Sequence, residues 1–194
     1  MPPIQKQKTA GTNLPYGLYE RQCGFGFSCS IKYLCLIYKE FLLNKNRDCQ
    51  LFSPDFYHSV VKPRQKKLVQ HIRSLTKAKI WYHTCGSCVE YIPDLIDNGV
   101  DIINPVQTSA RNMDPVQLKK QFGNNIVFWG GAVDVQHVLP FATPDRVKKD
   151  VRQSLEIFKP GGGYVFNNVH NIQSGVPAEN IIAMFEAAYE FGFY

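Results

Sequence analysis

Segments typical of β-strands alternate with segments typical of α-helices from about residue 53 to the end of the chain. Four runs rich in β-branched and aromatic residues predict strands, at Lys79–His83, Val100–Asn104, Ile126–Trp129 and Tyr164–Asn167. A strand, a helix and a second strand in this order form a parallel pair that the helix covers. The alternation therefore predicts an α/β fold with a parallel sheet of four strands and covering helices.

The helices are marked by residues that begin and end them. Ser53, Asp114 and Thr143 each precede a proline, which is the order of an N-cap followed by the first helical residue. Glycines and a proline mark the opposite ends. These signals predict helices at Pro54–Leu75 with a bend at Pro63, Ser87–Asp97, Pro115–Gly123, Thr143–Pro160 and Pro177–Glu190.

Four strand–helix units fit two architectures, a small doubly wound sheet or half of an eight-stranded (β/α) barrel. The pattern alone does not choose between them. In both, chemistry belongs at the carboxyl ends of the strands. That rule selects four segments as candidate functional loops, namely 83–88, 104–113, 130–141 and 167–175.

Composition and charge argue against several classes of protein, namely disordered, nucleic-acid-binding and membrane proteins. The chain has 194 residues, 44% of them hydrophobic and 20% charged, which is typical of a globular protein and argues against disorder. The net charge is +6, but most of the surplus lies in residues 1–50, and the basic run Lys62–Lys67 has the spacing of a solvated helix face. We therefore expect no nucleic-acid partner. No long uncharged apolar stretch and no signal peptide is visible, so we expect no membrane association, a cytoplasmic location and reduced cysteines.

The first candidate loop contains a pair of metal-ligand residues. His83 and Cys85 are two positions apart, so on a continuing strand they face the same side. Imidazole and thiolate suit Zn²⁺, and a catalytic zinc needs three protein ligands and one open position. His170, at the end of the last predicted strand, is a candidate for the third ligand. The alternative is a buried cysteine and two hydrogen-bonded histidines.

Two other motifs in these loops allow two interpretations each, and a glycine run outside them allows one. Cys85 and Cys88 have the spacing of a thioredoxin-type redox pair, but Cys88 is also a suitable packing residue at a helix start. The pair Gly130–Gly131 suits either the close approach of a ligand or a turn. The run Gly161–Gly163 follows a helix and precedes a strand, so we interpret it as a tight turn and not a phosphate loop.

Several short motifs in the right order carry a family resemblance. They are Tyr82–Ser87, Ile92–Ile96, Gly99–Gln107, Phe128–Gly131, Leu139–Pro144, His170–Gln173 and Val176–Ile181. Together they resemble the C-terminal half of the uroporphyrinogen decarboxylase superfamily. The closest branch is the methyltransferase-like one, which is similar to methylcobalamin:coenzyme M methyltransferases. The resemblance covers residues 51–194 and leaves residues 1–50 as an atypical, poorly patterned N-terminal segment.

The resemblance implies the C-terminal half of a TIM-type (β/α)₈ barrel with its site at the carboxyl ends of the strands. It also implies zinc, held by His83, Cys85 and His170, with His170 a histidine where those methyltransferases usually have cysteine. The decarboxylase branch has a histidine at that late position but lacks the His-x-Cys pair. His170 is accordingly the candidate catalytic residue, and Gln107, Asp134 and His137 are candidate substrate-binding residues.

Three functions follow as hypotheses. The favoured one is zinc-dependent transfer of a methyl group to a thiol from a methylated corrinoid, such as methylcobalamin, bound by a separate corrinoid protein. The alternative is decarboxylation of uroporphyrinogen, a tetrapyrrole substrate, in porphyrin and haem biosynthesis. The third is an inactive truncated barrel. Since half a barrel leaves open strand edges, a homodimer that closes it is one expected arrangement.

Overall fold

The computed structural model describes residues 33–36 and 53–193, which lie in the compact unit formed by Ile31–Tyr194. Its strands are β1 (Tyr33–Leu36), β2 (Lys79–His83), β3 (Ile102–Asn104), β4 (Val127–Trp129) and β5 (Tyr164–Val165). Its helices are α1 (Pro54–Phe56), η1 (Tyr57–Val61), α2 (Lys62–Leu75), η2 (Val89–Tyr91), α3 (Ile92–Asn98), α4 (Pro115–Phe122), α5 (Pro144–Phe158) and α6 (Ala178–Phe191). No helix in the described ranges is long and apolar enough to cross a membrane.

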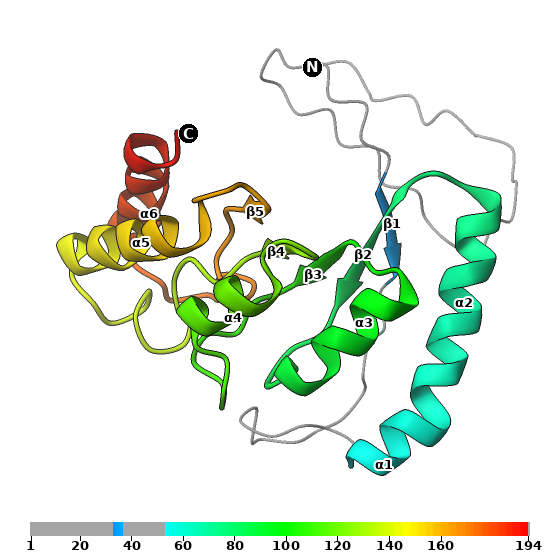
Figure 1. Cartoon of the computed structure of the whole chain (residues 1–194). Coiled ribbons are helices and arrows are strands. Elements are labelled where there is room, and N and C mark those ends of the chain that lie inside the picture. The colour runs from blue at the N-terminus through cyan, green and yellow to red at the C-terminus, as the bar shows by residue number, and fades with distance from the viewer. Residues whose placement is uncertain (1–32, 37–52, 194) are drawn as a thin grey trace, which may run out of the picture. The chain divides into compact units, whose positions relative to one another are not determined.

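The strands form one parallel sheet in the order β1-β2-β3-β4-β5 (Figure 1). A doubly wound sheet would reverse its strand order at a switch point, whereas this order follows the chain throughout. Strands added always on the same side, each through a helix, are the arrangement of a (β/α) barrel. The strand order confirms the predicted α/β fold, the C-terminal half of a TIM-type barrel.

Strand β1 is the one element that the sequence analysis does not predict. It lies within residues 1–50, and its backbone pairs in parallel with β2, with Tyr33 beside Lys79 and Leu36 beside Tyr82. The rest of the predicted N-terminal segment, including three of its four cysteines, lies outside the described residues. The boundary near residue 50 stays a prediction.

The two faces of the sheet differ in burial. Side chains on alternate positions face the helices and are buried, namely Ile80, Tyr82, Ile103, Phe128 and Tyr164. On the opposite face, which would be the inside of a closed barrel, Ile102 and Asn104 of β3 are also buried, but Trp81, His83, Val127, Trp129 and Val165 remain partly exposed in the described structure. The helix-side core is completed by Val147, Val151, Leu155 and Phe158 of α5. Burial of this apolar surface stabilises the sheet and its helices as one layered unit.

Three predicted N-caps are confirmed by their hydrogen bonds. Ser53 Oγ accepts from the Phe56 backbone N–H (3.3 Å), and Asp114 Oδ1 accepts from Gln117 N–H (2.9 Å). Thr143 Oγ1 accepts from Arg146 N–H (3.4 Å). Each bond satisfies one of the amide groups that the first helical turn leaves without a partner. The interpretation of Gly161–Gly163 as a turn is also confirmed, because all three have positive φ (69° to 76°) between α5 and β5.

The helix predicted to bend at Pro63 is irregular on the N-terminal side of that proline. The irregularity lies one turn earlier, in the π-helical turn η1, where the backbone N–H of Lys62 donates to the carbonyl of Tyr57. Pro63 stands in the first turn of α2, where its missing N–H costs little. The extra residue in η1 accommodates the proline, so α2 itself continues to Leu75. Strands β3, β4 and β5 are also shorter than predicted.

Candidate functional site

His83 ends strand β2 and is held by a residue of the neighbouring strand. Its Nδ1 lies 2.8 Å from Oδ1 of Asn104, which ends β3 directly opposite it in the sheet register. The Asn104 amide nitrogen donates to the carbonyl of Trp129 at 2.9 Å, so Oδ1 is the acceptor end of that amide. Nδ1 of His83 must then carry the proton. In the neutral ring Nε2 is left with its lone pair.

That lone pair lies beside a thiol. Cys85 Sγ is 3.5 Å from His83 Nε2, and Cys85 is exposed. A tetrahedral zinc with Zn–S of about 2.3 Å and Zn–N of about 2.0–2.1 Å separates its sulfur and nitrogen ligands by about 3.5–3.6 Å. The two donor atoms therefore already have the separation that zinc requires. The neighbouring Cys88 is in the core, with its Sγ 3.9 Å from Met113 Sδ, and neither cysteine forms a disulfide.

The loop that carries Cys85 is fixed by groups from the loop after β3. The backbone N–H of Gly86 donates to Oε1 of Gln107 (2.9 Å), and Thr84 N–H donates to the Asn104 carbonyl (2.8 Å). Gln107 is only 5% exposed. Its amide oxygen thus orients the His-x-Cys loop, a role that the sequence analysis does not assign. Its predicted contact with substrate stays a prediction.

His170 lies in the loop that follows β5. It is partly buried, and its carbonyl accepts a hydrogen bond from the Asn168 side chain. Among residues 53–193 no group of three His, Cys, Asp or Glu side chains is placed to hold a metal ion. The structure therefore brings together two of the three predicted ligands, His83 and Cys85. The role of His170 stays a prediction.

Asp134 and His137 form a pair in the loop after β4. Asp134 Oδ1 accepts from the backbone N–H groups of Gln136 (2.7 Å) and His137 (3.0 Å), and Oδ2 lies 3.0 Å from His137 Nδ1. Burial raises the pKa of Asp134, but the bonds from His137 and the two amides outweigh it and lower that pKa overall. Asp134 is therefore held as a carboxylate that organises its own loop. The predicted contact of this pair with substrate stays a prediction.

The pair Gly130–Gly131 makes a close approach to protein. A Cβ at Gly130 would lie 3.2 Å from the Val106 backbone nitrogen, and one at Gly131 would lie 3.1 Å from the Val106 carbonyl oxygen. Both glycines also have positive φ, 116° and 82°. They let the loop after β4 pack directly on the loop after β3, which bears Gln107. Of the two interpretations left open above, the turn is therefore the one that the structure favours.

Two tryptophans on the open face of the sheet lie next to this site. The ring centroids of Trp81 and His83 are 5.6 Å apart, and those of Trp81 and Trp129 are 6.2 Å apart in an edge-on arrangement. Neither tryptophan is among the site residues predicted from the sequence. The period of two along a strand could have placed Trp81 on the face of His83, but the neighbouring Trp129 depends on strand register.

Comparison with known proteins identifies relatives over most of the chain. The family model described as uroporphyrinogen decarboxylase (URO-D) matches residues 38–191, and so begins within the N-terminal segment. Uroporphyrinogen decarboxylase of Psychromonas ingrahamii is 30% identical over 101 residues, which are 52% of this chain and 27% of that protein. The enzyme of Mannheimia succiniciproducens is 28% identical over 101 residues, with the same coverage.

A solved structure agrees in fold. A methyltransferase from Methanosarcina mazei superposes with a TM-score of 0.59 at 22% identity and covers 74% of this chain and 39% of its own. The chain spans about a quarter of the length of the curated relatives described above.

Proposed function

Because the chain belongs to the uroporphyrinogen decarboxylase family, we propose that it supplies the zinc-binding half of a methyltransferase that acts on a thiol. One observation carries this proposal, the 3.5 Å separation of His83 Nε2 and Cys85 Sγ together with the hydrogen bond that orients the imidazole. A decarboxylase that works without metal has no need of a thiol at this position.

His83 and Cys85 would hold the zinc ion, and His170 is the proposed third ligand and catalytic residue. Bound zinc would keep the acceptor thiol as a thiolate at neutral pH, ready to take a methyl group from a methylated corrinoid. The corrinoid would be presented by a separate protein. Asn104 accepts from Nδ1–H of His83 and so orients Nε2 of the neutral ring toward Cys85, and Gln107 holds the loop that positions Cys85.

Metal analysis tests the proposal directly. Purified protein should contain stoichiometric zinc, and His83→Ala and Cys85→Ser should each remove most of it. His71→Ala is the matched control, because His71 is an exposed histidine on α2, away from the site. His170→Ala tests the third ligand separately. Zinc content that is unchanged in His83→Ala would contradict the metal site.

Activity assays separate the alternatives. A methyltransferase should demethylate methylcobalamin in the presence of a thiol and lose that activity with His83→Ala. The curated relatives named above are uroporphyrinogen decarboxylases, which makes decarboxylation the second candidate. Turnover of uroporphyrinogen by metal-free protein would favour it. Absence of both activities, together with absence of a cooperative unfolding transition, would support an inactive fragment.

A further inference from the structure

Helix α6 has two apolar faces, and the described part of the chain covers only one. Its buried face packs on α5 and joins the helix-side core through Ala183, Met184 and Ala187. Its other face exposes a stripe at helical spacing that continues just past the helix end, with exposed fractions of 57% for Ile182, 57% for Phe185, 76% for Tyr189 and 67% for Phe193. A contiguous apolar stripe of this kind marks an interaction surface more often than a solvated face.

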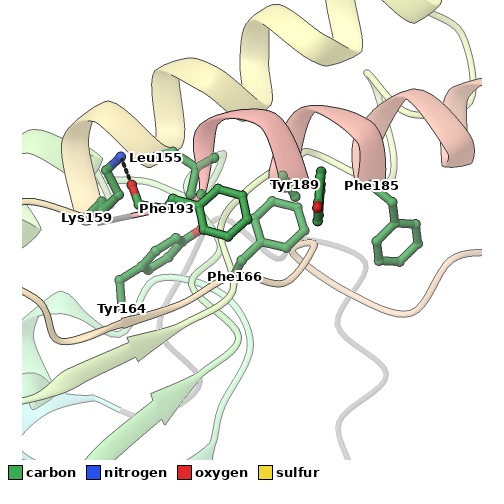
Figure 2. Close-up of a pocket in the computed structure, with 9 residues that line it drawn as sticks. Leu155, Lys159, Tyr164, Phe166, Phe185, Tyr189 and Phe193 are labelled. Atoms are coloured by element: carbon green, nitrogen blue, oxygen red, sulfur yellow. Dashed lines mark hydrogen bonds between the residues drawn. The ribbon is translucent and has the colours of Figure 1, made fainter. Parts of the chain in front are cut away.

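The stripe borders a groove of about 420 Å³ beside the edge strand β5 (Figure 2). The groove is lined largely by aromatic rings, those of Tyr164, Phe166, Phe185, Tyr189 and Phe193. Its end is fixed by Lys159, whose Nζ donates to the carbonyls of Phe191 (3.0 Å) and Phe193 (2.7 Å). The groove is therefore a formed surface at the β5 end of the sheet, where a further strand and helix can be added.

Helix α2 lies on the opposite side of the described structure from α6 and packs on α3 (Figure 1). It exposes Leu68 (43%) and Leu75 (72%). These leucines are seven residues apart and so share one face, and Ile182 and Tyr189 of α6 have the same separation. The two ends of the layered sheet thus present apolar side chains with matching spacing.

The charges that flank the two stripes are opposite. Helix α6 contains three acidic residues and no basic one, namely Glu179, Glu186 and Glu190. Glu186 already pairs with Lys148 of α5 at 2.8 Å, whereas Glu179 and Glu190 form no ion pair within residues 53–193. Helix α2 contains five basic residues and no acidic one, namely Lys62, Arg64, Lys66, Lys67 and Arg73. Within residues 53–193, Lys62, Lys66 and Arg73 pair with aspartates, whereas Arg64 and Lys67 are exposed and form no ion pair. The unpaired charges at the two ends are therefore of opposite sign and suit the contact of one end with the other end of a second copy.

We propose that two copies of this chain associate about a two-fold axis parallel to the strands, with α6 of each copy packed against α2 of the other. Such an axis leaves all strands parallel and brings the β5 edge of each copy beside the β1 end of its partner. Each end of the sheet is used once, so the assembly stops at two chains. Leu68 and Leu75 enter the aromatic groove, while Arg64 and Lys67 face the acidic flank of α6. The proposal does not depend on zinc.

Sedimentation velocity of the full chain at tens of micromolar tests it. The wild type should have twice the 22.1 kDa mass of one chain. Tyr189→Glu should give single chains, because it places a charge in the centre of the stripe. Glu190→Lys and Lys67→Glu should each weaken the dimer about tenfold by setting like charges against each other. Mixing these two variants should restore it, because one contact then pairs the two reversed side chains and the other pairs the two native ones.

Lys149→Glu is the control, since it reverses an exposed charge on α5 outside the proposed contact. Far-UV circular dichroism of each variant establishes that the chain is still folded. Wild-type protein with the mass of one chain would overturn the proposal. So would a dimer that Tyr189→Glu leaves intact, or two charge variants that stay dissociated when mixed.

Discussion

Asn104 Oδ1 accepts a hydrogen bond from Nδ1 of His83 across two neighbouring parallel strands, at 2.8 Å. The bond joins the ends of two strands, so the imidazole is oriented by the sheet and not by a loop. Asn104 is itself fixed by its bond to the Trp129 carbonyl on the next strand, at 2.9 Å. These two hydrogen bonds link the ends of three strands into one relay, and they therefore determine which nitrogen of His83 can bind a metal ion.

The first prediction concerns this relay. Asn104→Leu should weaken zinc binding about 10- to 100-fold, because the ring loses the acceptor that fixes its tautomer and orientation. Asn104→Asp should bind zinc as tightly as the wild type, since a carboxylate also accepts from Nδ1. Competition with a chromogenic chelator measures both affinities.

Asn171→Leu serves as the control for that experiment, because Asn171 is an exposed asparagine in the loop after β5. Equal zinc affinity in Asn104→Leu and the wild type would show that the relay does not orient a ligand.

The second prediction concerns Gln107. Gln107→Leu should lower the free energy of unfolding by about 1–3 kcal/mol, because the buried amide of Gly86 loses its acceptor. Urea denaturation measures the change. Gln117→Leu on the exposed face of α4 is the matched control and should stay within about 0.5 kcal/mol of the wild type. A Gln107→Leu protein as stable as that control would mean that the bond does not hold the loop.

The third prediction separates two costs of replacing glycine. Gly131→Ala and Gly161→Ala both place a side chain at positive φ, 82° and 75°, which costs about 1 kcal/mol. A Cβ at Gly161 meets no atom within 4 Å, whereas one at Gly131 lies 3.1 Å from Val106. Gly131→Ala should therefore be the more destabilising of the two in thermal unfolding. Equal losses would mean that the two loops are not in tight contact.

The fourth prediction is a pH dependence. The pKa of folded Asp134 lies below the ordinary 3.8, so its contribution to stability is present above that value. The contribution is lost as the pH falls through the lower, folded-state pKa. Stability of the wild type should therefore fall more steeply in acid, from about pH 5 downward, than stability of Asp134→Asn.

His137→Ala removes one of the groups that lower the Asp134 pKa, and it should reduce the steepness in the same direction. Denaturant titrations at a series of pH values measure all three proteins. Identical slopes for the wild type and Asp134→Asn would contradict the proposed ionisation.

Local signals in the sequence account for most of the elements. Strand β2 begins and ends where predicted, and the caps at Ser53, Asp114 and Thr143 form as expected, because each depends on residues no more than three positions away. Strand β1 was not predictable in this way. Its four residues carry little periodic pattern, and its identity as a strand depends on pairing with β2, more than forty residues later.

The residues of the candidate site also fall into two groups, those that a local sequence rule predicts and those that depend on tertiary contacts. The period of two along a strand places His83 and Cys85 on one side, and the 3.5 Å contact agrees with it. Asn104 and Gln107 act on that pair from the next strand and its loop, about twenty residues later in the chain, so no spacing rule could assign them. The glycines after β4 were ambiguous for the same reason, since their neighbour is Val106.

The amino-acid sequence by itself determined the α/β class, the helix starts after Ser53, Asp114 and Thr143, and the His-x-Cys pair, because capping and strand alternation act over a few residues. The helix predicted from Ser87 instead begins with a 3₁₀ turn at Val89, and its α-helix begins at Ile92. Only the tertiary structure decided the strand order, and with it the choice of a barrel over a doubly wound sheet. It also decided the tautomer of His83 and the exposed apolar side chains of α2 and α6. These depend on which strands become neighbours, and the packing of residues far apart in the chain sets that arrangement.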